Sequence, residues 1–148
     1  MPGREAALRT VEILLIEDSP ADARLFELAL VNSDLHHRLH TCADAAEAIT
    51  FLRREGEHAG APRPDLIFLD LNMPGKSGRE LLADLKLDED LKAIPVIILT
   101  SSAAAEDISD CYRHYANCFV TKPLQLDDFM STVRSTLQFW QEIAQLPT

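Results

Sequence analysis

Three carboxylates, a hydroxyl and a lysine lie at the ends of apolar runs of the sequence or just after them. Glu17 and Asp18 come after residues 11–16, Asp70 and Thr100 end residues 65–70 and 94–100, and Lys122 follows residues 117–120. Crowded carboxylates repel one another and raise one another's pKa unless a cation neutralises them. Mg²⁺ suits them, because it prefers oxygen ligands and usually keeps several waters. Lys122 and Thr100 would then contact a second anion, and a phosphoryl group fits because a metal and an ammonium together offset its charge.

These residues are interpreted as one site rather than as separate helix caps. A single acidic residue at the end of a strand commonly does no more than cap the next helix. Capping does not require carboxylates and a lysine at the ends of four different runs. In open parallel α/β sheets, ligands bind beyond the carboxyl ends of the strands, near the point where the strand order reverses. The sequence therefore predicts an acidic, metal-binding pocket that also accepts a phosphoryl group.

The segments that must position this pocket alternate between two kinds of pattern. Short apolar runs predict strands at residues 11–16, 37–42, 65–70, 94–100 and 117–120. Helical spacing of apolar residues predicts helices at residues 20–31, 44–54, 78–87, 103–115 and 126–145. The third and fourth runs are apolar on consecutive residues, as in central strands covered on both faces. The alternation predicts an α/β fold with a parallel sheet and helices on both of its faces.

Local signals support several of these helix boundaries. Ser19 precedes Pro20, which places a capping hydroxyl before a proline at the first helical position. Ser77 with Glu80 forms a capping-box pattern, and the four residues from Asp44 come close to one. The last helix carries an apolar stripe, predicted to pack in the core, of Leu126, Phe129, Met130, Val133, Leu137 and Trp140.

The composition narrows the class of protein. The 148 residues include 14 basic and 24 acidic side chains, a formal charge of −10, and 47% are hydrophobic. This length and apolar content suit one globular domain. The acidic balance argues against direct binding to nucleic acid or to an anionic membrane. No apolar run approaches the roughly 18 residues of a membrane span, and the start has no signal-peptide pattern, so we expect a cytoplasmic protein.

The cysteines point to no special chemistry. Cys42, Cys111 and Cys118 are odd in number and have no CxxC spacing. Neither a disulfide framework nor a zinc site is indicated. We expect reduced, mostly structural thiols.

Four motifs together resemble the receiver domains of two-component response regulators. They are Ile13-Leu-Leu-Ile-Glu-Asp-Ser-Pro20, Asp65-Leu-Ile-Phe-Leu-Asp-Leu-Asn-Met-Pro-Gly75 with Gly78, Ile97-Ile-Leu-Thr-Ser101 and Val120-Thr-Lys-Pro123. The resemblance covers essentially the whole chain, from Val11 to Gln141. Residues 57–63, 64–80 and 116–123 and the pair at 139–140 are similar, more narrowly, to the small stand-alone regulators that partner bacterial phytochrome histidine kinases.

The resemblance implies a fold, a domain plan and a function. The fold is flavodoxin-like, a doubly wound (βα)5 sheet with five parallel strands in the order 2-1-3-4-5. Residues 1–10 would form an N-terminal tail and residues 11–148 a single receiver domain with an extended C-terminal helix and no effector domain. The chain would be a response regulator, not an enzyme, which assists its own aspartyl phosphorylation and dephosphorylation. Its phosphodonor would be a sensor histidine kinase, expected to be a bacteriophytochrome.

The resemblance also assigns binding roles, position by position. Asp70 matches the aspartate that accepts phosphate from the kinase phosphohistidine. Glu17, Asp18 and Asp70, with the backbone carbonyl of Asn72, match the groups that hold Mg²⁺. Lys122 matches the lysine that contacts the phosphoryl group or the unmodified aspartate. Many relatives carry aspartate at the position of Glu17, which retains the charge on a longer side chain.

Three further positions match the family's conformational switch. Thr100 matches the hydroxyl residue that turns toward the phosphoryl oxygen, and Phe119 matches the aromatic side chain whose rotamer follows it. Many relatives carry tyrosine at position 119, so Phe119 keeps the packing but lacks a hydroxyl. Pro123 matches a position usually preceded by a cis peptide.

Output is expected through protein contacts. We predict a homodimer, as in the close relatives, through the face formed by the fourth helix, the fifth strand and the fifth helix. Phe139 and Ile143 lie beside the core stripe of that last helix, and apolar residues there could be buried across a two-fold interface. The alternative is a helix end that folds back on its own core.

Other functional classes are disfavoured but stay open. A receiver-like module that binds partners independently of phosphorylation would be expected to have lost part of the pocket. A Mg²⁺-dependent phosphatase with an aspartyl-phosphate intermediate needs a second carboxylate two residues after its nucleophile, where this chain has Asn72. A flavin site fits the topology, but the acidic loop at residues 17–20 would repel an anionic phosphate.

Overall fold

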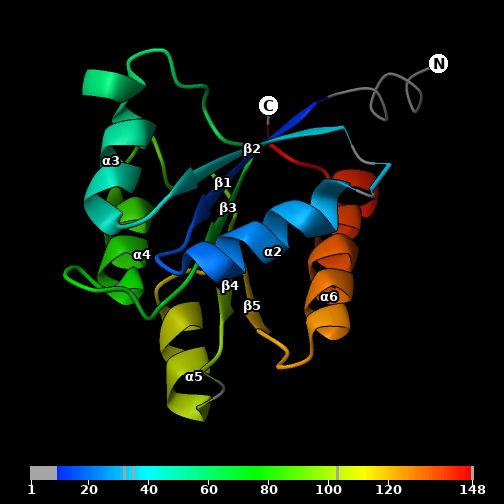
Figure 1. Cartoon of the computed structure of the whole chain (residues 1–148). Helices are drawn as coiled ribbons and strands as arrows, with labels where there is room; N and C mark the ends of the chain where they lie inside the picture. Colours follow the sequence, from blue (N-terminus) through cyan, green and yellow to red (C-terminus); the bar gives the residue numbers. More distant parts are fainter. Residues whose placement is uncertain (1–9, 32, 35, 103, 148) are drawn as a thin grey trace.

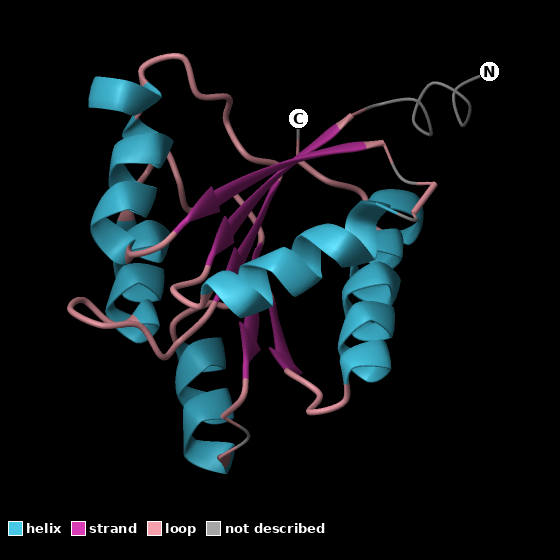
Figure 2. Cartoon of the chain, viewed as in Figure 1, coloured by secondary structure: helices cyan, strands magenta, loops and turns pink. Residues whose placement is uncertain are grey.

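The computed structural model describes residues 10–31, 33–34, 36–102 and 104–147. Its strands are β1 (Val11–Ile16), β2 (His37–Cys42), β3 (Leu66–Leu69), β4 (Val96–Thr100) and β5 (Cys118–Thr121). Its α-helices are α2 (Pro20–Val31), α3 (Ala45–Arg53), α4 (Gly78–Leu87), α5 (Ala105–Arg113) and α6 (Leu126–Gln138). A 3₁₀ turn, η1 (Gly56–His58), follows α3, and a π-helical turn, η2 (Phe139–Ile143), follows α6. Strands and helices alternate along the described chain, as predicted (Figure 2).

The strands form one parallel sheet in the order β2-β1-β3-β4-β5. This order confirms the expected flavodoxin-like topology. It reverses at β1, because β2 lies on one side of β1 and the later strands lie on the other. In the register, Ile16 is opposite Leu69, and Thr100 is opposite Thr121. The residues that follow β1 and β3 therefore start side by side, and so do those that follow β4 and β5.

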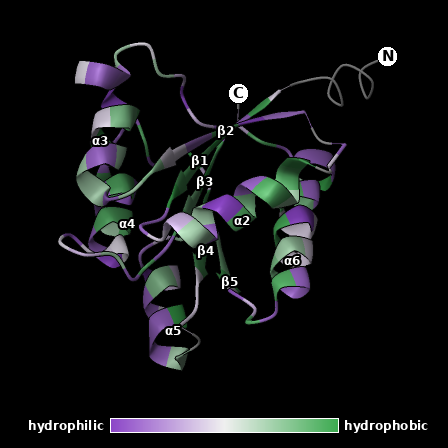
Figure 3. Ribbon diagram, viewed as in Figure 1, coloured by the Kyte–Doolittle hydropathy of each residue, from purple (hydrophilic) through white to green (hydrophobic). Residues whose placement is uncertain are grey.

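Helices cover both faces of the sheet (Figure 1). Helices α3, α4 and α5 pack on one face, and α2 and α6 pack on the other. Successive residues of a strand face opposite sides. Leu14 and Ile16 of β1 therefore lie in the core cluster under α3, α4 and α5, and Ile13 and Leu15 lie in the cluster under α2 and α6. Every residue of β3 and β4 is buried, which confirms the prediction of central strands. In Figure 3 the central strands are predominantly hydrophobic, whereas the edge strand β2 is largely hydrophilic and the helices carry both colours.

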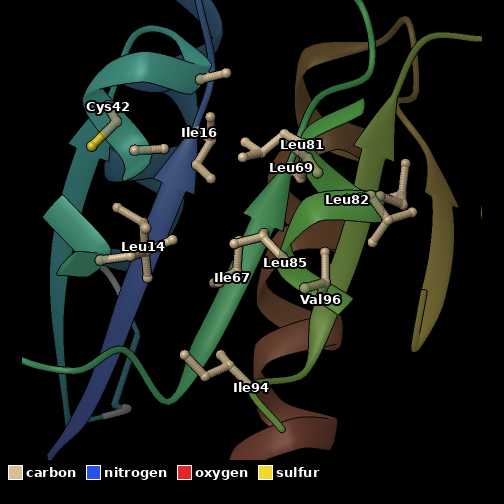
Figure 4. Packing of buried hydrophobic residues seen from close by; sticks show 14 of the residues in the cluster. Leu14, Ile16, Cys42, Ile67, Leu69, Leu81, Leu82, Leu85, Ile94 and Val96 are labelled. Carbon is tan, nitrogen blue, oxygen red and sulfur yellow. The ribbon is translucent and has the colours of Figure 1, made fainter. Parts of the chain in front are cut away.

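Helix α4 is held on the sheet by leucines spaced along one face. Leu81 and Leu85 lie one helical turn apart and pack beside Leu69 and Ile67 of β3 (Figure 4). Burying a leucine side chain of this kind stabilises the fold by about 1.5–3 kcal/mol. This packing fixes the N-terminus of α4 against the carboxyl end of β3.

The elements differ from the sequence prediction mainly at their ends. Strands β3 and β4 are shorter than the predicted runs 65–70 and 94–100, and β5 lies one residue later than the predicted 117–120. Asp44, expected as the first residue of the helix at residues 44–54, is instead the cap of α3, and its side chain accepts the backbone N–H of Glu47. Arg54 ends that helix with a left-handed φ of 56°. Helix α5 is shorter than predicted, and the expected start at Ala103 lies outside the described residues. The final α-helix ends at Gln138, and the π-helical turn carries the chain on to Ile143 rather than to residue 145.

Leu126 does not belong to the core. Phe129, Val133 and Leu137 of the predicted stripe are buried, whereas Leu126 is 51% exposed. Leu126 begins α6 at the carboxyl edge of the sheet, so it borders a surface groove beside Lys122 instead of packing under the helix.

The predicted cis peptide before Pro123 is wrong for this structure. The Lys122–Pro123 peptide is trans, as are all peptides between described residues. The trans isomer of an X–Pro bond is favoured by about 0.5–1 kcal/mol. The Lys122 N–H donates to the Thr100 carbonyl at 2.7 Å.

The ends of the domain plan are only partly described. Apart from Thr10, the expected tail at residues 1–10 lies outside the described residues. Within the described part of the chain, no helix combines the length and the apolar character needed to cross a membrane.

Candidate phosphoacceptor and metal site

The predicted pocket residues gather at the carboxyl edge of the sheet. Glu17 and Asp18 follow β1, Asp70 follows β3, Thr100 ends β4, and Lys122 follows β5. The backbone continues the strand pattern at this edge, because the Asp70 N–H donates to the Ile16 carbonyl at 3.1 Å. The parallel topology thus brings residues from four strands to one place.

The three carboxylates form a compact cluster. Glu17, Asp18 and Asp70 each offer an oxygen, and these oxygens lie within 4.8 Å of one another. Glu17 and Asp70 are each 6% exposed, while Asp18 is more open to solvent. Clustered carboxylate oxygens with room for water on one side are the donor set that a hard divalent cation takes. The residues present therefore fit such an ion.

Lys122 joins this cluster through three ion pairs. Its Nζ lies 2.5 Å from Glu17 Oε1, 2.8 Å from Asp22 Oδ2 and 3.2 Å from Asp70 Oδ2. The Lys122 side chain is only 9% exposed. The sequence predicts Lys122 in the pocket but does not predict Asp22 there, which lies in the first turn of α2.

The charges of the site shift one another's protonation. Burial raises the pKa of Glu17 to about 7, and the neighbouring Asp70 adds to the rise, although Lys122 opposes it. Burial would also raise the pKa of Asp70, but hydrogen bonds with Glu17 and the Asn72 N–H, together with the Lys122 charge, hold that pKa below its ordinary value. Burial would lower the pKa of Lys122, but its bonds to Asp22 and Glu17 raise it instead. At neutral pH, Asp70 and Lys122 are therefore ionised.

Asn72 and Thr100 complete the inner wall. The Asn72 N–H donates to Asp70 Oδ1 at 3.1 Å, and its side-chain amide donates to the Thr100 hydroxyl at 3.3 Å. Thr100 is fully buried. Asn72 thus links Thr100 to Asp70.

Phe119 lies on the edge strand β5, opposite Ile98 of β4. It is partly buried against the core cluster under α3, α4 and α5. Its backbone N–H donates to the hydroxyl of Tyr112 on α5 at 3.2 Å. Sequence analysis did not single out Tyr112, because its contact with β5 depends on how α5 packs.

Gly78 allows α4 to approach the backbone of Asp70 closely. A Cβ atom at Gly78 would lie 2.2 Å from the carbonyl oxygen of Asp70 and 2.7 Å from the Cα of Leu71. The Gly78 N–H donates to the Leu71 carbonyl at 3.1 Å. The chain after β3 is thus held directly against the N-terminus of α4.

A groove of about 270 Å³ opens beside Lys122. Its lining residues come from α2, from the end of β4 and from the β5–α6 connection, and they are Asp22, Leu25, Ser101, Lys122, Pro123, Leu124, Gln125, Leu126 and Phe129. Leu124 is 98% exposed. The carboxylate cluster is therefore flanked by an open surface with apolar side chains.

Comparison with known proteins agrees with this geometry. Residues 13–134 match the response regulator receiver domain family. The response regulator Rcp1 of Synechocystis sp. is 44% identical over 135 residues, which are 91% of this chain and 92% of that protein. A crystal structure of the Mn²⁺-bound form of Rcp1 has a TM-score of 0.88 at 43% identity, covering 93% of this chain and 99% of the other.

A second solved structure is similar over nearly the same length. The phosphorylated cyanobacterial phytochrome response regulator RcpA has a TM-score of 0.90 at 45% identity, covering 95% of this chain and 100% of the other. Family match, sequence identity and fold agree with the arrangement of carboxylates, hydroxyl and lysine at the sheet edge. The chain belongs to the response regulator receiver domain family.

Proposed function

We propose that Asp70 accepts a phosphoryl group from the phosphohistidine of a sensor histidine kinase and that the chain then signals through protein contacts. The observation that carries the proposal is the placement of Lys122. Its ammonium contacts the Asp70 carboxylate inside a buried acidic cluster, so Asp70 is ionised and Lys122 balances its charge at the carboxyl edge of the sheet.

In this phosphotransfer the protein mainly positions the reacting groups and neutralises charge. An oxygen of Asp70 forms a bond to phosphorus while the bond from phosphorus to the histidine nitrogen breaks, and that nitrogen leaves with the electron pair. Lys122 neutralises charge on the phosphoryl oxygens. Thr100, which is linked to Asp70 through two hydrogen bonds donated by Asn72, turns its hydroxyl to the phosphoryl group. Phe119 then fills the space that Thr100 leaves and changes the surface formed by α5, β5 and α6.

Mg²⁺ is the metal we propose for the site. Glu17, Asp18 and Asp70, with the backbone carbonyl of Asn72, would hold it. When bound, the ion supplies positive charge next to the transferred group. The support is the carboxylate cluster of this chain and the divalent metal in the structure of Rcp1.

We further propose a phytochrome-type histidine kinase as the phosphodonor. RcpA is a phytochrome response regulator, and a regulator named AtBRR, with a TM-score of 0.72 at 33% identity, is a bacteriophytochrome response regulator. The similarity to both supports the same class of partner for this chain.

A homodimer through α5, β5 and α6 is part of the proposal. Phe139 and Ile143 are 47% and 70% exposed. A groove of about 330 Å³ on this face is lined by Asn117, Cys118, Ser135, Thr136, Phe139 and Trp140. Exposed apolar side chains beside a groove favour burial against a second copy.

The experiment is intact mass spectrometry after incubation with acetyl phosphate and Mg²⁺. We expect one added phosphate on the wild type, none on Asp70→Asn, and none without Mg²⁺. Asp90→Asn is the matched control, because it removes the same charge from an exposed position in the segment between α4 and β4. No adduct on the wild type would refute the proposal and favour an interaction module that works without phosphorylation.

A further inference from the structure

Asp22 is a pocket carboxylate without a role in the proposed phosphotransfer. Its Oδ2 lies 2.8 Å from Lys122 Nζ, closer than Asp70 Oδ2 at 3.2 Å. The Asp22 side chain is 35% exposed, whereas that of Lys122 is 9% exposed. Asp22 also lines the open groove beside Lys122. Asp22 therefore contacts the ammonium from the solvent side of the pocket.

The backbone before α2 fixes the position of Asp22. The Ser19 hydroxyl accepts the Asp22 N–H at 3.3 Å, so Ser19 caps the helix three residues before the aspartate. The Ser19 N–H in turn donates to Glu17 Oε2 at 3.2 Å. Ser19 therefore links the positions of Glu17 and Asp22, the two carboxylates on either side of it in the sequence that contact Lys122.

We propose that Asp22 is a positioning residue that holds the Lys122 ammonium toward the groove and so weakens its hold on a phosphoryl group at Asp70. This role rests on the proposed function. An ammonium has three N–H donors, and Lys122 directs its contacts to Glu17, Asp22 and Asp70. A phosphoryl group on Asp70 must compete with Asp22 for that ammonium, because both offer anionic oxygens.

A different role is available to Asp22. An acidic side chain in the first turn of a helix stabilises the helix through its dipole. That role would change the stability of the fold but would not depend on Lys122. The two roles therefore differ in what a second substitution at Lys122 does.

Binding of beryllofluoride, a phosphoryl mimic, provides the test. The dissociation constant is measured by calorimetry with Mg²⁺ for the wild type, Asp22→Asn, Asp22→Glu and the control Asp90→Asn. Asp22→Asn should bind roughly two- to fivefold more tightly, the range expected for losing one partly exposed ion pair. Asp22→Glu, which restores a carboxylate, should return toward the wild-type affinity, and Asp90→Asn should match the wild type.

The Lys122→Gln background separates positioning from a general charge effect. The gain from Asp22→Asn should disappear there, because no ammonium remains to be released. Urea denaturation without ligand gives a second test. The effects of Asp22→Asn and Lys122→Gln on the free energy of unfolding should be non-additive, because the two side chains contact each other.

Equal affinity of wild type and Asp22→Asn, or a gain that persists in Lys122→Gln, would overturn the positioning role alone. A wild type that binds no beryllofluoride would overturn the proposed function and, with it, this role.

Discussion

Replacing Gly78 with alanine tests how closely α4 must approach Asp70. The new Cβ would meet the Asp70 carbonyl oxygen at 2.2 Å and the Leu71 Cα at 2.7 Å. Both are backbone atoms, so no side-chain rotation can relieve the contact. Either α4 or the segment after β3 must move by more than 1 Å to restore the 3.4 Å of an ordinary contact.

The expected cost follows from that displacement. Forcing an extra methyl group into a packed interior costs about 1–3 kcal/mol, which for a chain of this size lowers the Tm by about 2–4 °C per kcal/mol. The movement also shifts Asp70 relative to Lys122. Because misplacing a reacting group by about 1 Å can slow a reaction by up to about 100-fold, phosphorylation by acetyl phosphate should slow by roughly 10- to 100-fold.

Gly60→Ala is the matched control. A Cβ there meets no atom within 4 Å, so the free energy of unfolding should stay within about 0.5 kcal/mol of the wild type. Urea denaturation measures the first effect, and the rate of mass increase with acetyl phosphate measures the second. A Gly78→Ala protein with wild-type stability and rate would refute the reasoning.

Three further predictions concern the metal, the thiols and the dimer face. Burial raises the pKa of Glu17 from 4.5 to about 7, so folding favours the neutral form of this carboxyl. Without metal, the contribution of Glu17 to the free energy of unfolding should therefore fall as the pH rises through that range. Mg²⁺ should accordingly raise the Tm more at pH 8 than at pH 6, and an equal shift would contradict this. Cys42 is buried and Cys118 only partly so, and burial raises the pKa of Cys42 to about 12. Iodoacetamide at pH 8 should therefore label Cys118 before Cys42, as read by peptide mass spectrometry, and earlier labelling of Cys42 would count against it. Phe139→Asp should lower the dimer fraction in light scattering, and a monomeric wild type at micromolar concentration would refute the dimer.

The strand positions follow from the sequence because each strand is a short, uninterrupted feature. The bounds of β1 and β2 agree with the prediction at both ends. For β3 and β4, consecutive apolar residues indicate burial on both faces, and the structure buries all of them. Since parallel strands align their carboxyl ends, placing the strands also places Glu17, Asp70 and Thr100.

Contacts that depend on packing between helices could not be predicted in the same way. The sequence indicates only that Asp22 is an acidic residue in the first turn of a helix. Its contact with Lys122, 100 residues further along the chain, makes it part of the pocket. The Tyr112 hydroxyl reaches the Phe119 N–H because α5 lies over the edge strand. Leu126 follows the helical period of the core stripe, but the helix begins where the sheet ends.

The charge balance of the pocket argues for a role beyond folding. Among the described residues, the carboxylates of Glu17, Asp22 and Asp70 contact the Lys122 ammonium, and Asp18 offers a further carboxylate oxygen within 4.8 Å of oxygens of Glu17 and Asp70. Burying charge costs free energy that pairing only partly repays, and the raised pKa of Glu17 shows that the fold opposes its ionisation. Neutral side chains would satisfy the same strand ends at lower cost. The negative excess is instead suited to a divalent cation, and Lys122 remains within reach of the group that Asp70 would carry.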